Sequence, residues 1–109
     1  MSVHLSIETE QKIELSIPIS TEPFFNRCWK PLAEKHKLEY ISAIQLGIEL
    51  DREWVAALLL EIKQIPAYLE AEHFSGDDIA FFRERLTFII SSLDRFLSRH
   101  TGALNGWVG

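Results

Sequence analysis

The strict alternation of apolar and polar residues over the first twenty positions most constrains the fold. In the segments SVHLSI and KIELSIPI, every second residue is Val, Leu or Ile, and the residues between them are mostly polar. A period of two is that of a β-strand with one buried face, and the polar letters ETEQ fit a connection between two such strands. The apolar set is Val3, Leu5, Ile7, Ile13, Leu15, Ile17 and Ile19, and the opposite face carries His4, Ser6, Glu14 and Ser16. The sequence therefore predicts an antiparallel hairpin with one face in water, and Pro18 places its second strand at a sheet edge.

The next segment predicts a short helix and a third strand. Residues 20–22, STE, supply a helix cap and Pro23 is tolerated in a first turn, so we expect a helix from about Glu22. Pro31 would clash with a carbonyl one turn earlier, which predicts a kink or break near Trp29 or Lys30. Residues 38–44, LEYISAI, are rich in β-formers and predict a third strand, which residues 47–50 continue after a turn.

The second half of the chain predicts two longer helices. Asp51 is a suitable cap for a helix that runs to about Gln64 and ends before Pro66. Ser75 caps the last helix, which runs to about His100, and the Gly-rich tail after it is expected to be irregular. The predicted fold is α+β, with a small antiparallel sheet, made of the N-terminal hairpin and a third strand near 38–44, and two or three helices on one face. We expect a single domain over residues 1–109.

The sequence also indicates a compartment. Cys28 is the only cysteine, so no internal disulfide can form and a reducing environment is expected. The first ten residues lack the basic and apolar regions of a signal peptide. The longest strictly apolar run, residues 54–60, is far shorter than the roughly 20 residues of a membrane-spanning helix. We therefore expect a cytoplasmic protein that does not bind a membrane.

Charge is unevenly distributed along the chain. The net charge is −5, but residues 27–37 hold four cations and one acid, whereas residues 38–82 hold nine acids and two bases. An acidic middle region disfavours nucleic-acid binding and favours a basic protein partner, although acids also simply keep a protein soluble. Four arginines at 83, 85, 95 and 99 are diluted by nearby acids, and no aromatic–basic motif surrounds them. We expect no nucleic-acid partner.

Cys28 and His36 are the parts of a nucleophilic pair, and they share the apolar side of the first predicted helix with Phe24, Phe25, Trp29 and Leu32. A thiol among apolar groups is inert, because its pKa is raised. Eight helical residues separate the two by about 12 Å along the axis, too far for a hydrogen bond. We predict a packing face and no catalytic residues. A break at Pro31 would bring the pair closer, which leaves a minor enzyme using Cys28 and His36 as an alternative.

No metal or cofactor motif stands out. Five polar residues gather in LEAEHFSGDD, namely Glu70, Glu72, His73, Asp77 and Asp78, but their spacing matches no calcium loop or zinc helix. The glycines never form a phosphate loop, and no Gly-x-Ser-x-Gly motif occurs. We expect no metal and no cofactor.

Two helices carry more apolar surface than one core needs. Phe81 and Phe88 lie away from the main apolar stripe of the last helix, and Arg95 and Arg99 extend their line. Leu60 lies opposite the main stripe of the preceding helix. Either the tail covers this surface, with Trp107 folded over the two phenylalanines, or a partner does. A small-molecule pocket is a further alternative.

These observations favour a non-catalytic interaction protein that works as a homodimer or as a small acidic binder of another protein. Immunity proteins that neutralise a basic toxin or nuclease are of this kind, and the chain is similar to them in size and charge only. Carboxylates between positions 49 and 78 would then stand in for a nucleic-acid backbone. The expected interaction residues are Leu60, Phe81, Phe88, Arg95, Arg99 and Trp107.

Overall fold

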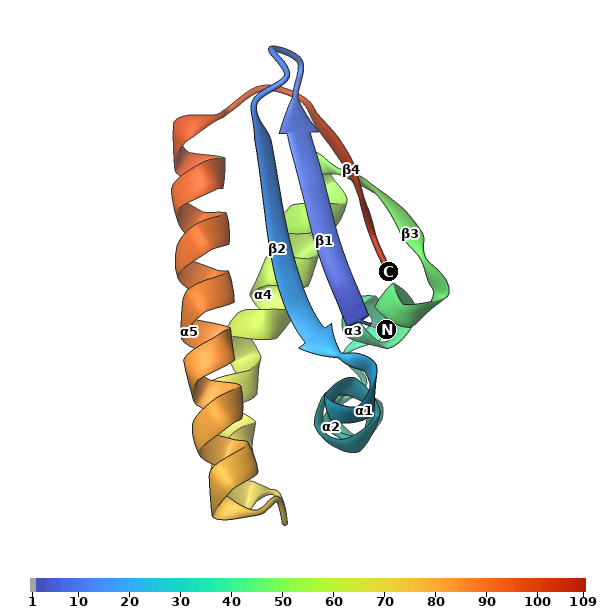
Figure 1. Cartoon of the computed structure of the whole chain (residues 1–109), viewed down its shortest axis with the longest axis vertical. Coiled ribbons are helices and arrows are strands. Elements are labelled where there is room, and N and C mark those ends of the chain that lie inside the picture. Colours follow the sequence, from blue (N-terminus) through green and yellow to red (C-terminus); the bar gives the residue numbers. More distant parts are fainter. Residues whose placement is uncertain (1) are drawn as a thin grey trace.

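The computed structural model describes residues 2–109 and is built on one four-stranded antiparallel sheet (Figure 1). The strands are β1 (Ser2–Thr9), β2 (Glu14–Thr21), β3 (Ile48–Asp51) and β4 (Leu104–Val108), in the order β2-β1-β4-β3. The predicted hairpin and the α+β class are confirmed. β2 lies at an edge, as Pro18 indicated, and the register slips once between Val3 and His4.

The segment after β2 stays helical through Pro31. The Thr21 hydroxyl accepts the Phe24 N–H at 3.3 Å and caps α1 (Glu22–Phe24), which continues as a π-helical segment (Phe25–Trp29) and then as α2 (Lys30–His36). The sequence predicted a kink or a break near Trp29 or Lys30. The chain has no break there, and its irregularity is the π-helical segment that ends at Trp29. The wider π turn precedes Pro31 and accommodates its ring, so the chain needs no interruption there.

The predicted third strand at 38–44 is wrong, because this stretch forms α3 (Glu39–Ala43) followed by a 3₁₀ turn (Ile44–Leu46). Leu38, the residue before α3, makes no side-chain cap. Instead the Glu61 carboxylate, from α4, accepts the backbone N–H groups of Tyr40 and Ile41 at 3.1 and 2.9 Å. A capping group from another part of the chain thus overrides the local β preference. Residues 47–50, proposed only as a continuation, supply most of β3.

Two long helices form the second layer. Asp51 caps α4 (Arg52–Tyr68) and Ser75 caps α5 (Gly76–Arg99), as predicted. α4 does not end before Pro66 but continues to Tyr68, and a 3₁₀ turn (Leu69–Ala71) follows it. Ile65 and Leu69 are fully buried on either side of Pro66, so packing compensates for the hydrogen bond that the proline removes.

The tail predicted to be irregular is strand β4, which lies in the interior of the sheet between β1 and β3. Arg52, in the first turn of α4, donates to the carbonyl oxygens of Leu97, His100 and Gly102 at 2.6–3.0 Å. This guanidinium holds the end of α5 and the loop that leads into β4. The C-terminal segment is therefore positioned by a residue about fifty positions earlier.

The core lies between one sheet face and the helices. α4 crosses behind the sheet and α5 runs beside β2, while the other sheet face carries no helix (Figure 1). The largest fully buried side chains are Trp29, Phe25, Phe82, Leu5, Ile7 and Ile17. None of the helices in residues 2–109 combines the length and hydrophobicity needed to span a bilayer.

Candidate functional site

Cys28 and His36 have separate partners. Cys28 is fully buried, as predicted, and its thiol donates to the Asp78 carboxylate on α5 at 3.8 Å. Burial raises the pKa of Cys28 above its ordinary 9.0. The His36 ring stacks on Tyr68, with ring centres 3.7 Å apart, and its Nε2 lies 3.3 Å from Glu72. The thiol and the imidazole are thus each held by a different carboxylate.

The acidic loop forms ion pairs with neighbouring elements. Arg27 donates two hydrogen bonds of 3.0 Å to Asp78. These hydrogen bonds are the main reason that the pKa of Asp78 lies below its ordinary 3.8. Burial would raise the pKa of Glu72, but hydrogen bonds from Lys35 and His36 outweigh it and lower that pKa. Within residues 2–109, no group of three or more His, Cys, Asp and Glu side chains is placed to hold a metal ion.

Most carboxylates between positions 49 and 78 likewise form a hydrogen bond or an ion pair with another group of the same chain. Asp51 caps α4, Glu61 caps α3, and Glu70 lies 3.4 Å from Arg83. Together with Glu72 and Asp78, five of the eight acids in this range already have a partner within residues 2–109. Among the exposed acids of this region, Glu49 lies on β3, next to the sheet face without helices.

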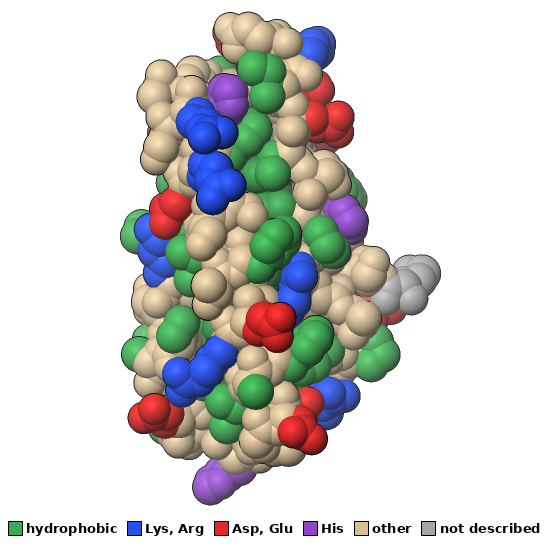
Figure 2. Space-filling model, turned by 60° about the vertical axis from the view of Figure 1, so that its left-hand side comes forward, with side chains coloured by type: hydrophobic (Ala, Val, Ile, Leu, Met, Phe, Trp, Pro, Cys, Tyr) green, Lys and Arg blue, Asp and Glu red, His purple; other side chains and the backbone are tan. Residues whose placement is uncertain are grey.

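Phe81 and Phe88 border a groove between α5 and the end of β2. Each ring is about half exposed, and the hollow beside them has a volume of about 420 Å³ and is closed on the strand side by residues 18–21. Phe81 makes an edge-to-face contact with Phe24, and Arg85 lies over Phe88 at 4.9 Å. Arg85 also donates to the Pro18 carbonyl oxygen. The face of the molecule that includes α5 shows hydrophobic side chains among charged ones (Figure 2).

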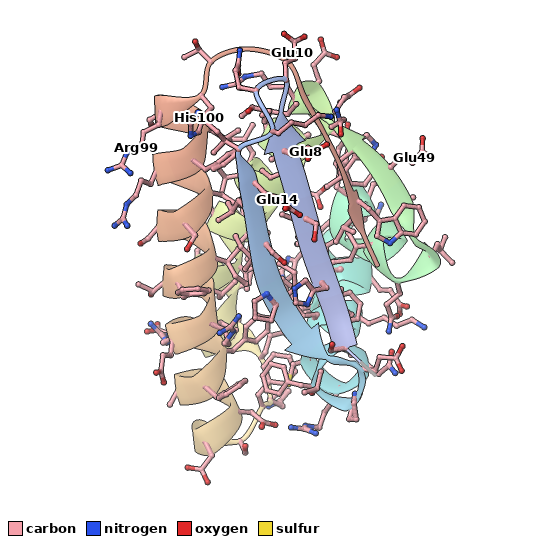
Figure 3. The ribbon with its side chains drawn as sticks, turned by 45° about the horizontal axis from the view of Figure 1, so that its top comes forward. Glu8, Glu10, Glu14, Glu49, Arg99 and His100 are labelled. Atoms are coloured by element: carbon pink, nitrogen blue, oxygen red, sulfur yellow. The ribbon has the colours of Figure 1, made fainter. Side chains whose placement is uncertain are left out.

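The other predicted interaction residues do not gather at one place. Arg95 and Arg99 are exposed on α5, and Arg99 points away from the sheet (Figure 3). Leu60 is exposed on α4. Trp107 does not cover Phe81 and Phe88, because it lies on β4, opposite Ser6 of β1 and Glu49 of β3. Strand β1 separates β4 from β2, the edge strand that borders the groove of the two phenylalanines. That alternative is therefore wrong.

Trp107 marks instead the middle of the sheet face without helices, which we call the open face. Leu104 and Val108 of β4 point into the core, so Asn105 and Trp107 point outward. The Trp107 ring is half exposed and packs over Gly47, where a Cβ atom would lie 2.5 Å from ring atom Cζ2. Gly47 has a φ of +80°, so both conformation and space require glycine there.

Carboxylates lie on both sides of Trp107. Glu8 and Glu14 occupy directly opposite positions on β1 and β2, and with Trp107 they line a hollow of about 270 Å³. Glu49 and Trp107 line a second hollow of about 420 Å³ toward β3. In Figure 3, Glu8 and Glu14 lie together on the sheet and Glu49 lies across it on β3. Within residues 2–109, the one ion pair made by these three acids joins Glu8 to Lys12 at 3.5 Å.

Sequence reasoning placed Glu14 on the wet face of the hairpin but did not recognise Glu8 and Glu14 as a pair. The signal was available, since a short connection between alternating strands sets which residues face each other. The sequence alone could not show that Glu49 and Trp107 lie beside this pair, because their position depends on the pairing of β4 with β1 and β3. We define the open-face site as Glu8, Glu14, Glu49, Asn105 and Trp107.

Comparison of the chain with models of protein families, with curated proteins and with solved structures finds no match.

Proposed function

We propose that the protein is a non-catalytic binding protein whose open face recognises a basic protein partner. The observation that supports this most is the direct opposition of Glu8 and Glu14 beside the half-exposed Trp107. Like charges at directly opposite sheet positions repel each other and destabilise a fold. A positively charged ligand that binds between Glu8 and Glu14 would relieve this repulsion, which favours binding. The net charge of −5 would also speed the encounter with a basic partner.

The recognition we propose is of lysine or arginine side chains. A cation over an indole ring is attracted by the electrons of its face, and tryptophan is the strongest aromatic side chain in this contact. A side chain that enters the hollow beside Trp107 would meet Glu8 and Glu14 at its charged end. A second cation would meet Glu49 in the hollow on the other side of the ring. The sheet needs no rearrangement for either contact.

The non-catalytic part of the proposal is supported by the state of Cys28 and His36. The thiol has no exposed surface, and the imidazole is stacked on Tyr68 and bonded to Glu72. A catalytic cysteine requires access and a lowered pKa, and Cys28 has neither. Its free thiol also fits the reducing cytoplasm, where we place the protein.

The first test is a titration of the ¹⁵N-labelled protein with a nona-arginine peptide. We expect shifts at the Trp107 indole and at the amides of Glu8 and Glu14, and weaker binding by about tenfold in Trp107→Ala, which removes the cation–π contact and its packing. Glu8→Gln/Glu14→Gln should weaken binding and reduce its salt dependence. Leu60→Ser, on the far side of the sheet, is the matched control.

Shifts that avoid the open face, or binding that Trp107→Ala leaves unchanged, would show that the proposal is wrong. A pull-down from a lysate with the wild-type chain and with Trp107→Ala then identifies natural partners, which should be retained by the first and lost by the second.

A further inference from the structure

We propose that the outer side of α5 is a self-association surface, on which the α5 helix of a second copy packs antiparallel with Phe88 at the two-fold axis. The proposal concerns a surface separate from the open-face site. It uses four of the residues that the sequence marked for interaction and that the open face does not contain.

The surface is a regular stripe of exposed side chains. Counting from the start of α5, residues at alternating steps of four and three fall on one side of the helix and are all exposed, namely Asp77, Phe81, Glu84, Phe88, Ser91 and Arg95. Arg99 follows four residues later and is also exposed. This seven-residue spacing is the one that keeps a helix face directed at a partner helix. The helix has 24 residues, about 36 Å at 1.5 Å per residue, and offers a long contact.

The two aromatic side chains of the stripe are held in place before any partner arrives. The Phe81 ring packs edge-to-face on Phe24 at 5.0 Å. The Arg85 guanidinium lies over the Phe88 ring and is itself anchored on the Pro18 carbonyl oxygen. Both rings nevertheless remain 48–49% exposed. Phenylalanine is enriched at protein interfaces, and side chains that are already held in place lose little conformational entropy when a partner binds.

Charge complementarity identifies the partner as a second copy. The N-terminal half of the stripe carries Asp77 and Glu84, and the C-terminal half carries Arg95 and Arg99. Within residues 2–109 none of these four forms an ion pair, although the same helix uses Asp78, Arg83 and Asp94 in ion pairs. A stripe with opposite charges at its two ends is complementary to itself when reversed. In a two-fold symmetric dimer, each contact between two different residues then occurs twice.

The position of Phe88 sets the register. When two antiparallel helices cross at Phe88, residues equally far from it on either side meet across the axis. Asp77 then faces Arg99 of the second copy, Phe81 faces Arg95, and Phe88 faces its own counterpart. The helix dipoles also run in opposite directions, which favours this arrangement over a parallel one. A shift that sets Phe81 against Phe88 would place Asp77 opposite Ser92 and leave Arg99 without an acid.

Sedimentation equilibrium over a wide concentration range tests the proposal. We expect a monomer–dimer equilibrium that Phe88→Glu weakens by at least about tenfold, because it buries two charges at the axis. Arg99→Asp should weaken it by about three- to tenfold, since exposed ion pairs contribute little individually but occur twice here. Asp77→Arg combined with Arg99→Asp restores the pairs and should recover the wild-type association.

Leu60→Glu is the control, because it places a charge on an exposed apolar residue of the other long helix. A wild-type chain that stays monomeric at every concentration would overturn the proposal. So would a dimer that Leu60→Glu abolishes, or one that Phe88→Glu leaves intact. Binding of nona-arginine on the open face is measured independently, so either proposal can fail without the other.

Cross-linking checks the register. Under mild oxidation, a chain carrying Asp77→Cys and Arg99→Cys should form disulfide-linked dimers, and a chain carrying Asp77→Cys and Ser92→Cys should form far fewer. The wild-type chain serves as the blank, because its own Cys28 is fully buried. Equal cross-linking of both variants, or none in the first, would contradict the antiparallel arrangement about Phe88.

Discussion

Glu8 on β1 and Glu14 on β2 face each other across a pair of positions that do not exchange hydrogen bonds. The N–H of Thr9, the next residue, donates to the carbonyl oxygen of Ile13, just before β2, at 2.9 Å. The backbone groups of Glu8 therefore point the other way, toward β4. Side chains at such positions are closer together than at hydrogen-bonded ones. Two carboxylates therefore lie side by side on the open face, with one lysine, Lys12, near the first of them.

Replacing Glu14 with lysine should stabilise the protein. The change turns a like-charge pair into an opposite-charge pair, and we expect the free energy of unfolding to rise by about 0.5–1 kcal/mol. Urea denaturation at low salt measures it. Glu10→Lys, in the turn of the same hairpin, makes the same charge change without facing Glu8 and is the control. An equal gain in both variants would mean that net charge, and not the opposed pair, is responsible.

Removing the Glu61 carboxylate should loosen α3. In Glu61→Ala the backbone N–H groups of Tyr40 and Ile41 lose their shared acceptor, and we expect a loss of about 2 kcal/mol, the usual range for buried groups left unbonded. Glu61→Gln keeps one acceptor oxygen and should lose less. The rate of amide hydrogen exchange should increase at residues 39–43. Unchanged protection there in Glu61→Ala would contradict the capping role.

The Arg27–Asp78 pair should make stability sensitive to acid. Because hydrogen bonding holds the pKa of folded Asp78 below the ordinary 3.8, its contribution is complete above that value and is lost as pH falls through the lowered pKa. The same sign holds for Glu72, whose pKa is lowered from 4.5. Urea midpoints between pH 6 and pH 2 should fall less steeply in Asp78→Asn than in the wild type. Glu70→Gln, on a largely exposed carboxylate, is the comparison and should leave the slope nearly unchanged.

The Cys28 thiol should react with iodoacetamide only after unfolding. It has no exposed surface, and burial raises its pKa, so little thiolate forms near neutral pH. Mass spectrometry of the native protein should show no adduct under conditions that fully label the protein in urea. Rapid native labelling at pH 7 would show an accessible thiol and would revive the catalytic alternative for Cys28 and His36.

The sequence by itself determined the features that depend on near neighbours. Alternation in residues 2–20 is enough to predict a hairpin, since only one register buries Val3, Leu5 and Ile7. The caps at Asp51 and Ser75 are local hydrogen bonds and were predicted correctly. The burial of Cys28 followed from the aromatic residues that share its side of the helix. In each case the deciding interactions lie within a few residues along the chain.

Tertiary structure decided the rest, because the deciding partner is distant in sequence. Residues 38–44 have β propensity, but the Glu61 carboxylate supplies the missing cap and the helix prevails. The Gly-rich tail has little propensity of its own and becomes a strand because β1 and β3 offer it hydrogen bonds on both sides. Trp107 reaches the open face, and the acids beside it, through that pairing. Backbone hydrogen bonds between distant segments leave no periodic trace in a sequence, and here they placed the residues of the candidate site.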